Sequence, residues 1–170
     1  MMLLENVRRK YEKNSFALAI ALVCQAFATS VEFYDEQQNN PSIMGIRLRI
    51  FNDSNAPINN AKLRYYFHRG SEPDTLECYY LAGATVSRNN VNGDLSYFEL
   101  SIPSIPKGYY PDMAGFSLAL HNKKYSNWGK SLDYSYQISS RLAKNTKVVL
   151  LSDDKVIFGQ EPDVKFEPKP

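Results

Sequence analysis

Residues 46–67 read IRLRIFNDSNAPINNAKLRYYF, and this stretch decides the fold. From Ile46 to residue 50, isoleucine or leucine alternates with arginine, which is the two-residue period of a β-strand with one apolar face. Residues 52–57 then supply asparagine, aspartate, serine and proline, which favour turns. Residues 62–67 alternate again. The stretch therefore predicts two strands that follow each other across a short polar turn.

The same pattern continues along the chain. Further strand-like segments occur at residues 76–81, 84–87, 95–102, 114–120, 134–138, 148–151 and 155–158. Asparagine, aspartate, glycine and proline separate them, and no segment after residue 28 shows a helical period. Short strands at this regular spacing predict an all-β fold, an antiparallel β-sandwich.

Composition limits the class of protein. The chain has 170 residues, of which 44% are hydrophobic and 22% charged, as expected for one globular domain. It has 20 basic and 18 acidic residues, so a net charge of +2 gives no reason to expect nucleic-acid binding. Two cysteines cannot form a disulfide framework. No apolar run is long enough to predict a membrane span.

The first 28 residues differ from the rest. Basic residues precede an apolar run from Phe16 to Val23. Ala26-Phe27-Ala28 follows and has the small residues of a signal-peptidase cleavage site, so the segment has the pattern of a secretory signal peptide. An amphipathic helix packed on the domain is the alternative, and Cys24 leaves a lipid anchor open. Residues 1–28 hold four basic and two acidic residues, so cleavage leaves 16 of each sign and no net charge.

These features predict the organisation of the chain. We expect a signal peptide at residues 1–28, one β-sandwich at residues 29–162, and a flexible tail rich in charge and proline at residues 163–170. The expected location is secreted, extracellular or at the cell surface, with the periplasm also open.

No catalytic motif is evident. The two histidines, His68 and His121, lack the sequence signature of a catalytic triad. Glu32, Glu77 and Glu99 could supply a glycosidase pair, but any chain with this many carboxylates allows that. We therefore predict that the chain is not an enzyme.

Several blocks, taken in order, resemble a known family. They are residues 50–58 leading into 63–67, then Cys78, Tyr125-Ser126-Asn127-Trp128, Asp133-Tyr134-Ser135-Tyr136, and the terminal block at residues 155–162. In this order and spacing they resemble the family 3 carbohydrate-binding modules, the cellulose-binding modules of scaffoldins and bacterial cellulases. The resemblance runs from about residue 31 to 162. It implies jelly-roll topology, a flat sheet face that lies on polysaccharide, and a structural calcium ion.

The resemblance also implies ligand-contacting residues. Tyr125 stands where the family usually has a tryptophan of its planar strip, and Trp128 stands where the family often has tyrosine. In the family, the cysteine is followed by an acidic residue and then by an aromatic residue or a histidine, both in the planar strip. Tyr79 and Tyr80 stand at these two positions. With Asn127, these are the expected carbohydrate-binding residues. Stacking of rings on pyranose faces would carry the binding.

Other positions depart from the family pattern. The loop at residues 81–90 holds no aromatic residue, and Ala119 replaces the arginine of the strip. Trp128 could equally be a core residue. If Tyr79 and Tyr80 lie on a regular strand, only one of them can share a face with Tyr125. Tyr109-Tyr110 forms a second aromatic pair that we expect to be exposed.

The implied calcium site is incomplete. Asp133 is retained, but its neighbour is Leu132, and residues 68–70, directly after the block at residues 63–67, carry no carboxylate. Calcium prefers hard oxygen ligands. We therefore predict a degenerate site in which Arg69 pairs with Asp133 in place of the metal. The alternative is a structural calcium ion for which Glu72 or Asp74 restores a ligand.

Together these observations predict a divergent, free-standing module. It would bind cellulose or a related β-glucan without catalysis, and its partners would be the polysaccharide and possible cellulases or cell-surface proteins. The alternative is a cell-surface structural or protein-interaction domain that keeps the fold and has lost the cellulose-binding strip. Neither nucleic acid nor a membrane span is expected.

Overall fold

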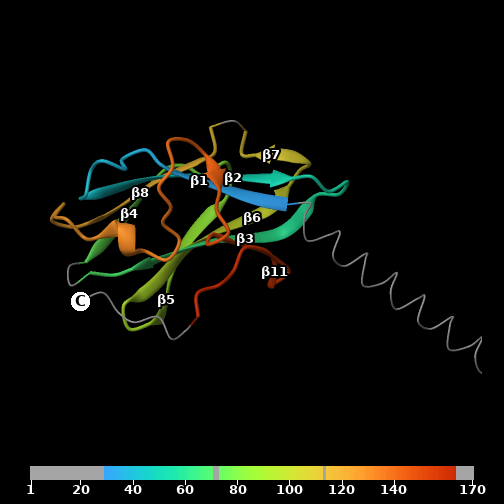
Figure 1. The fold of residues 1–170 in the computed structure, drawn as a ribbon. Coiled ribbons are helices and arrows are strands. Elements are labelled where there is room, and N and C mark those ends of the chain that lie inside the picture. The colour runs from blue at the N-terminus through green and yellow to red at the C-terminus, as the bar shows by residue number, and fades with distance from the viewer. Residues whose placement is uncertain (1–28, 71–72, 113, 164–170) are drawn as a thin grey trace, which may run out of the picture.

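The computed structural model describes residues 29–70, 73–112 and 114–163. Two antiparallel sheets face each other as a sandwich (Figure 1). In these ranges the only helical element is the short 3-10 turn η1 (Lys130–Leu132), and no helix is long and apolar enough to cross a membrane. The predicted signal peptide and residues 164–170 of the predicted tail lie outside the described residues.

Each sheet follows a non-sequential strand order. Sheet A has the order β4 (Asp74–Tyr80), β8 (Phe116–Asn122), β2 (Ile43–Asn52), β1 (Thr29–Asp35) and β9 (Ala143–Lys144), and β7 (Gly108–Tyr110) pairs with the far end of β2. Sheet B has the order β11 (Lys155–Phe158), β10 (Val149–Ser152), β3 (Ile58–His68), β6 (Leu95–Ile105) and β5 (Thr85–Asn92). The all-β sandwich predicted from the sequence is confirmed.

The alternation in β2 and β3 builds the core. Ile46, Leu48 and Ile50 of β2 are completely buried, and so are Leu63 and Tyr65 of β3. These side chains belong to one cluster between the two sheets. The residues between them point outward, as the two-residue period requires. The sequence pattern therefore sets which side chains each sheet presents to solvent.

The strand predicted at residues 134–138 is wrong. This segment has no strand pairing; the buried Ser135 instead joins it to β3 and to residues 145–147 through isolated hydrogen bonds. Ser135 Oγ accepts from the Tyr66 N–H at 2.9 Å and donates to the Lys147 carbonyl at 2.6 Å. The Ser135 N–H donates to the Tyr66 carbonyl, and the Ser135 carbonyl accepts from Asn145 Nδ2. Strands β1, β7 and β9 were not among the predicted strands.

A buried ammonium group holds the end of the β1–β2 connection. Lys130 Nζ donates to Asp35 Oδ2 at 2.6 Å and to the carbonyls of Gln37 and Ile43 at 2.6 and 2.7 Å. The other Asp35 oxygen accepts from the Gln37 and Gly45 N–H groups, both at 2.8 Å. Both charged side chains are buried, so each needs the other to offset its lost hydration.

Candidate functional site

On the outer face of sheet A, the last residues of β4 are exposed, whereas every residue of the neighbouring strand β8 is buried. Phe116, Leu118 and Leu120 of β8 point into the core, so the residues between them point outward. Among these, His121 lies opposite Thr75 of β4, and Ala119 lies opposite Glu77. The loop that follows β8 folds back over this edge and brings Tyr125 to it.

Tyr125 lies flat on the His121 imidazole. The two ring centroids are 4.1 Å apart and the ring planes differ by 13°. His121 is 4% exposed, whereas Tyr125 is 52% exposed. Because the imidazole covers one face of the tyrosine ring, the exposed area belongs mainly to the other face. The result is a supported, flat aromatic surface.

The loop at residues 122–126 holds this ring in place. The buried Asn122 side chain donates from Nδ2 to the Ser126 carbonyl and Oγ at 3.1 and 2.8 Å, and its Oδ1 accepts from the Ser126 N–H at 2.9 Å. Between these residues Tyr125 has a φ of +51°, a left-handed conformation that is uncommon outside glycine. Asn122 therefore closes the loop that turns Tyr125 back onto His121.

Glu77 connects Tyr79 to the same site. Its Oε2 accepts a hydrogen bond from the Tyr79 hydroxyl, and its Oε1 lies 3.4 Å from His121 Nε2. The hydrogen bond from Tyr79, followed by that from His121, lowers the pKa of Glu77. The same hydrogen bond raises the pKa of Tyr79, and the nearby Tyr125 hydroxyl raises it further. Tyr79 is 66% exposed, so a second exposed ring lies beside Tyr125.

Tyr80 is directed elsewhere. The β4–β8 register shifts between Cys78 and Tyr80, so the two tyrosines do not follow a regular strand alternation. Tyr80 is also exposed, but it lies near Tyr110, whose pKa is raised first by burial and then by Tyr80. Of the two candidates, the structure places Tyr79 beside Tyr125.

Trp128 does not belong to this surface. It is 7% exposed and forms part of the core cluster, with its ring 6.3 Å from the Phe67 ring. Its assignment as a stacking residue is therefore wrong, because a ring covered by protein cannot lie on a sugar. Asn127 is exposed, and its Oδ1 accepts from the Gly129 N–H at 3.0 Å, which gives it a role in the turn.

Around Asp133 the described residues do not gather the carboxylates that a calcium site of the implied kind needs. Asp133 is buried, and its Oδ1 accepts from the His68 N–H at 3.0 Å. Calcium takes about six to eight oxygen ligands. Among residues 29–70, 73–112 and 114–163, no three His, Cys, Asp or Glu side chains gather as metal ligands. The predicted pairing of Arg69 with Asp133 is wrong, since no ion pair joins these two described residues; the Arg69 N–H donates to the Asp94 carbonyl.

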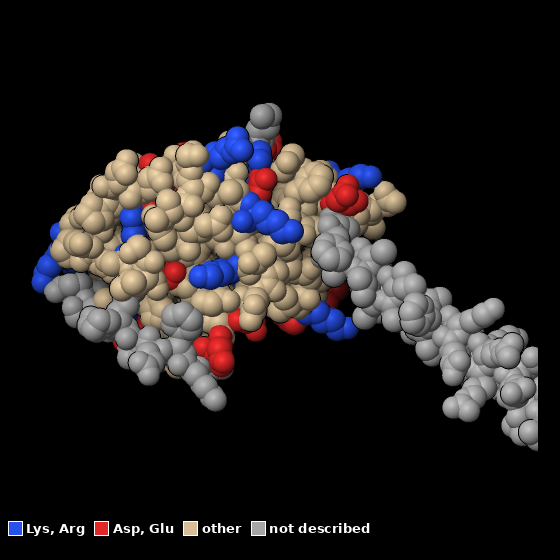
Figure 2. All heavy atoms as spheres, in the orientation of Figure 1, with Lys and Arg blue, Asp and Glu red and all other residues tan. Residues whose placement is uncertain are grey.

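Carboxylates do not gather as a glycosidase pair either. Glu77 and Glu32 lie on sheet A, whereas Glu99 lies on β6 of sheet B and pairs with Arg64 at 2.8 Å. Glu32 pairs with Arg49 at 2.6 Å. Figure 2 shows basic and acidic side chains interspersed over the visible face, without a large patch of one sign.

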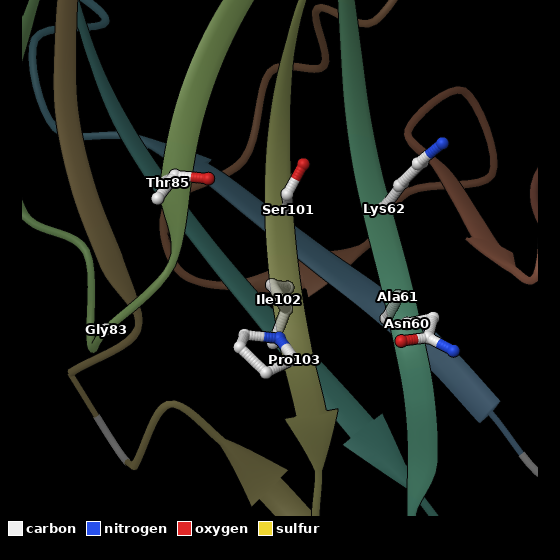
Figure 3. A pocket seen from close by; sticks show the side chains of 8 residues that line it. All are labelled: Asn60, Ala61, Lys62, Gly83, Thr85, Ser101, Ile102 and Pro103. Atoms are coloured by element: carbon white, nitrogen blue, oxygen red, sulfur yellow. The ribbon is translucent and has the colours of Figure 1, made fainter.

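A hollow of about 390 Å³ lies on the other sheet. Figure 3 shows its lining side chains, which come mainly from β3, β5 and β6. They are Asn60, Ala61, Lys62, Gly83, Thr85, Ser101, Ile102 and Pro103. Lys62 pairs with Asp154 at 2.5 Å, and Asn60 donates to Asp153 at 3.0 Å. No aromatic ring lines this hollow, so it offers no stacking surface.

The geometry can be compared with known proteins. Residues 30–159 match the family model described as the cellulose binding domain. The chain belongs to this family. Family 3 modules are non-catalytic carbohydrate-binding modules, so membership indicates carbohydrate binding and agrees with the prediction that the chain is not an enzyme. The resemblance recognised in the sequence is confirmed.

Solved structures with the same fold include three family 3 modules. A family 3b module from the biomass-sensing system of Clostridium clariflavum matches with a TM-score of 0.67 and 22% identity, over 80% of this chain and 98% of its own. A module described as a unique CBM3 of Hungateiclostridium clariflavum matches with a TM-score of 0.64 and 26% identity, over 79% of this chain and 98% of its own. The family 3b module of the cellulosomal cellobiohydrolase 9A of Clostridium thermocellum matches with a TM-score of 0.68 and 20% identity, over 79% of this chain and 99% of its own.

Some site residues could not be recognised from the sequence. Glu77 and His121 entered only as possible catalytic groups, yet they support the exposed tyrosines. Asn122 gave no signal, because its role depends on a loop conformation. The spacing of four residues between His121 and Tyr125 indicates nothing by itself, since it produces a ring stack only when the chain reverses direction.

Proposed function

We propose that this module binds cellulose or a related β-glucan through the outer face of sheet A at the β4–β8 edge, without catalysis. The observation that carries the proposal is the Tyr125 ring lying flat on His121 with its outer face exposed. An aromatic face of this kind stacks on the apolar face of a pyranose ring. The parallel stack on His121 fixes the ring before ligand arrives, which lowers the entropy lost on binding.

Polar groups beside this ring supply hydrogen bonds. Glu77 accepts hydrogen bonds as a carboxylate, and those from Tyr79 and His121 lower its pKa below the ordinary value. Tyr79 adds a second exposed ring and a hydroxyl. Asn127, exposed in the same loop, remains a candidate contact through its amide. Tyr80 contributes at the margin of this surface, near Tyr110.

The surface is smaller than the strip that the family resemblance implies. Ala119 offers no hydrogen bond at the position of the strip arginine, and Trp128 is buried. Fewer stacked rings bind a flat crystalline surface less tightly. We therefore expect stronger binding to amorphous cellulose or a single glucan chain than to crystalline cellulose.

A retention experiment tests the proposal. The protein is mixed with microcrystalline cellulose, amorphous cellulose and chitin, and the bound fraction is compared with that of Tyr125→Ala. We expect retention on amorphous cellulose and its loss in Tyr125→Ala, because that substitution removes the stacking ring. Ile138→Ala is the control, since Ile138 is 77% exposed and lies in a different loop, after η1. Equal retention of wild type and Tyr125→Ala would contradict the proposal.

The second candidate is a cell-surface protein-interaction domain. It is favoured by the burial of Trp128 and the presence of Ala119, which together reduce the implied strip. It predicts that none of the three polysaccharides retains the protein and that soluble glucans do not raise its melting temperature.

Export is part of the proposal. The signal-peptide pattern at residues 1–28 supports a secreted protein, with residues 29–162 as the binding domain. Cellulases or other cell-surface proteins would be its functional partners on the polysaccharide.

A further inference from the structure

A second supported tyrosine occurs on sheet A. Tyr109 of β7 lies opposite Phe51 of β2, and their ring centroids are 4.7 Å apart. The Arg49 guanidinium carbon lies 4.0 Å from the centre of the Tyr109 ring. Tyr109 is 47% exposed, whereas the Arg49 side chain is only 14% exposed. The guanidinium is therefore beneath the ring, and the solvent side of the ring is open.

This arrangement repeats that of Tyr125. There, an exposed tyrosine lies on the buried His121, which faces Glu77 of the neighbouring strand. Here, an exposed tyrosine lies on Arg49, which pairs with Glu32 of the neighbouring strand β1 through Nε and Nη2 at 2.7 and 2.6 Å. Each ring rests on a flat nitrogen-containing group that a glutamate holds in place. A cation under the ring adds a favourable interaction that fixes its orientation.

Strand register places both tyrosines on the same face. Ile46, Leu48 and Ile50 point into the core, so Arg49 and Phe51 point outward. Tyr109, directly opposite Phe51, points to the same side. His121 lies on this face as well, opposite Ile43 at the other end of β2. Figure 1 shows β7 at one end of this layer and the labels of β8 and β4 toward the other.

The register also sets their separation. Arg49 follows Ile43 by six residues in β2. At about 3.4 Å per residue, the two supporting groups are about 20 Å apart along the strand. The Arg47–Glu36 ion pair, with an N···O distance of 2.8 Å, lies along β2 between them. A disaccharide cannot reach from one tyrosine to the other, whereas a longer glucan chain can.

We propose that Tyr109 is a second stacking subsite, so that one extended glucan chain crosses sheet A from Tyr125 to Tyr109. This inference rests on the proposed function and specifies its substrate as a chain of several sugar residues. The paired charges favour a neutral ligand, because Glu32 already balances Arg49 and Glu36 balances Arg47. Sugar hydroxyls between the two rings would bond to the exposed part of the Arg47–Glu36 pair.

Calorimetry with oligosaccharides of two lengths tests the inference on the full chain. Cellohexaose spans both rings, and cellotriose reaches only one. We expect Tyr109→Ala to weaken cellohexaose binding about tenfold, equivalent to about 1.4 kcal/mol, and to leave cellotriose binding unchanged. Tyr109→Phe keeps the ring and should bind both as wild type does. Ile138→Ala controls for loss of an exposed apolar side chain.

The outcomes separate this inference from the proposed function. If Tyr125→Ala abolishes binding of both sugars and Tyr109→Ala changes neither, the second subsite is wrong and the proposed function stands. If Tyr109→Ala weakens the binding of cellohexaose and cellotriose equally, the inference that only a long chain reaches Tyr109 is wrong. If Tyr125→Ala has no effect on either sugar, the proposed function itself fails.

A second measurement avoids dependence on the folding of Tyr109→Ala. Wild-type protein labelled with 3-fluorotyrosine is titrated by fluorine NMR, with the Tyr109 resonance assigned from Tyr109→Phe. We expect this resonance to shift with cellohexaose and to stay in place with cellotriose. A resonance that ignores cellohexaose while the Tyr125 resonance shifts would overturn the inference.

Discussion

The outer faces of the two sheets use the same residue types in opposite ways. On sheet B, Tyr66 is 3% exposed, its hydroxyl donates to Glu161 at 3.0 Å, and its ring lies 5.2 Å from that of Tyr97. Arg64 pairs with Glu99 and with Glu161 at 2.8 and 2.9 Å. On sheet A, Tyr125 and Tyr109 also have charged or polar neighbours, yet about half of each side chain is exposed.

The difference lies in how many sides of the ring are covered. Tyr66 has neighbouring rings on two sides, from Tyr97 and Tyr134, so its apolar surface contributes to stability. Tyr125 rests on His121, and Tyr109 lies against Arg49 and Phe51, yet about half of each tyrosine stays exposed. Tyrosine, arginine and glutamate therefore stabilise the fold on one sheet and prepare a ligand surface on the other.

The largest expected effect comes from breaking the sheet B cluster. Tyr66→Ala removes a buried ring and its hydrogen bond to Glu161, and should lower the free energy of unfolding by about 3 kcal/mol. Urea denaturation measures the loss. Below the denaturation range, glucan affinity per folded molecule should equal that of wild type. Tyr66→Phe, which keeps the ring, should recover most of the stability; a loss of affinity in a folded Tyr66 variant would contradict the division between the sheets.

A smaller effect should follow from releasing the loop on sheet A. Asn122→Ala removes three hydrogen bonds to Ser126, so Tyr125 no longer keeps its position on His121. We expect about fivefold weaker glucan binding by calorimetry. The accompanying loss of stability should be about 1 kcal/mol.

Asn145→Ala is the matched control, because Asn145 is another buried asparagine whose Nδ2 donates to the backbone, at Ser135. It should lose stability with unchanged affinity. Equal loss of affinity in both variants would mean that global destabilisation, and not the position of Tyr125, controls binding.

The smallest effect should be a gradual loss of stability at alkaline pH. Burial raises the pKa of Tyr66, and burial followed by the nearby Asp35 raises the pKa of Tyr136 to about 12. A tyrosine with a raised pKa keeps its proton in the folded state after the unfolded chain has lost it. Its contribution is therefore complete below the ordinary value of 10.0 and is lost as pH rises toward 12.

Melting temperatures between these two pH values measure this effect. They should fall more steeply in wild type than in Tyr136→Phe, which removes one titrating group. A melting temperature that is constant over the interval, or equal slopes in the two proteins, would show that Tyr66 and Tyr136 do not control the alkaline response.

The sequence predicted the sandwich because its signal is local. Alternation from Ile46 fixes which side chains face the core, and turn residues mark the strand ends. Tyr125 could be selected in the same way, as an aromatic residue in a polar loop. Trp128, three residues later, could not be placed, because its burial depends on Phe67, which is distant in the chain.

Contacts between distant segments and local irregularities could not be predicted. The ring contact of Tyr109 and Phe51 joins residues 58 positions apart through a register that involves the short strand β7. The register shift at Cys78 removes the alternation on which the assignment of Tyr79 and Tyr80 depended. That cysteine is also exposed on β4, although a lone cysteine is usually buried.

The buried pair of Lys130 and Asp35 has a consequence for how this domain can evolve. Replacing either residue alone leaves a buried charge without its counterpart and costs about 3–5 kcal/mol, a large part of the stability of a small domain. Replacing both with apolar side chains removes the unpaired charge, but it also takes these side-chain partners from the carbonyls of Gln37 and Ile43 and the N–H groups of Gln37 and Gly45. Along a lineage these two positions, 95 residues apart, should therefore change together or not at all.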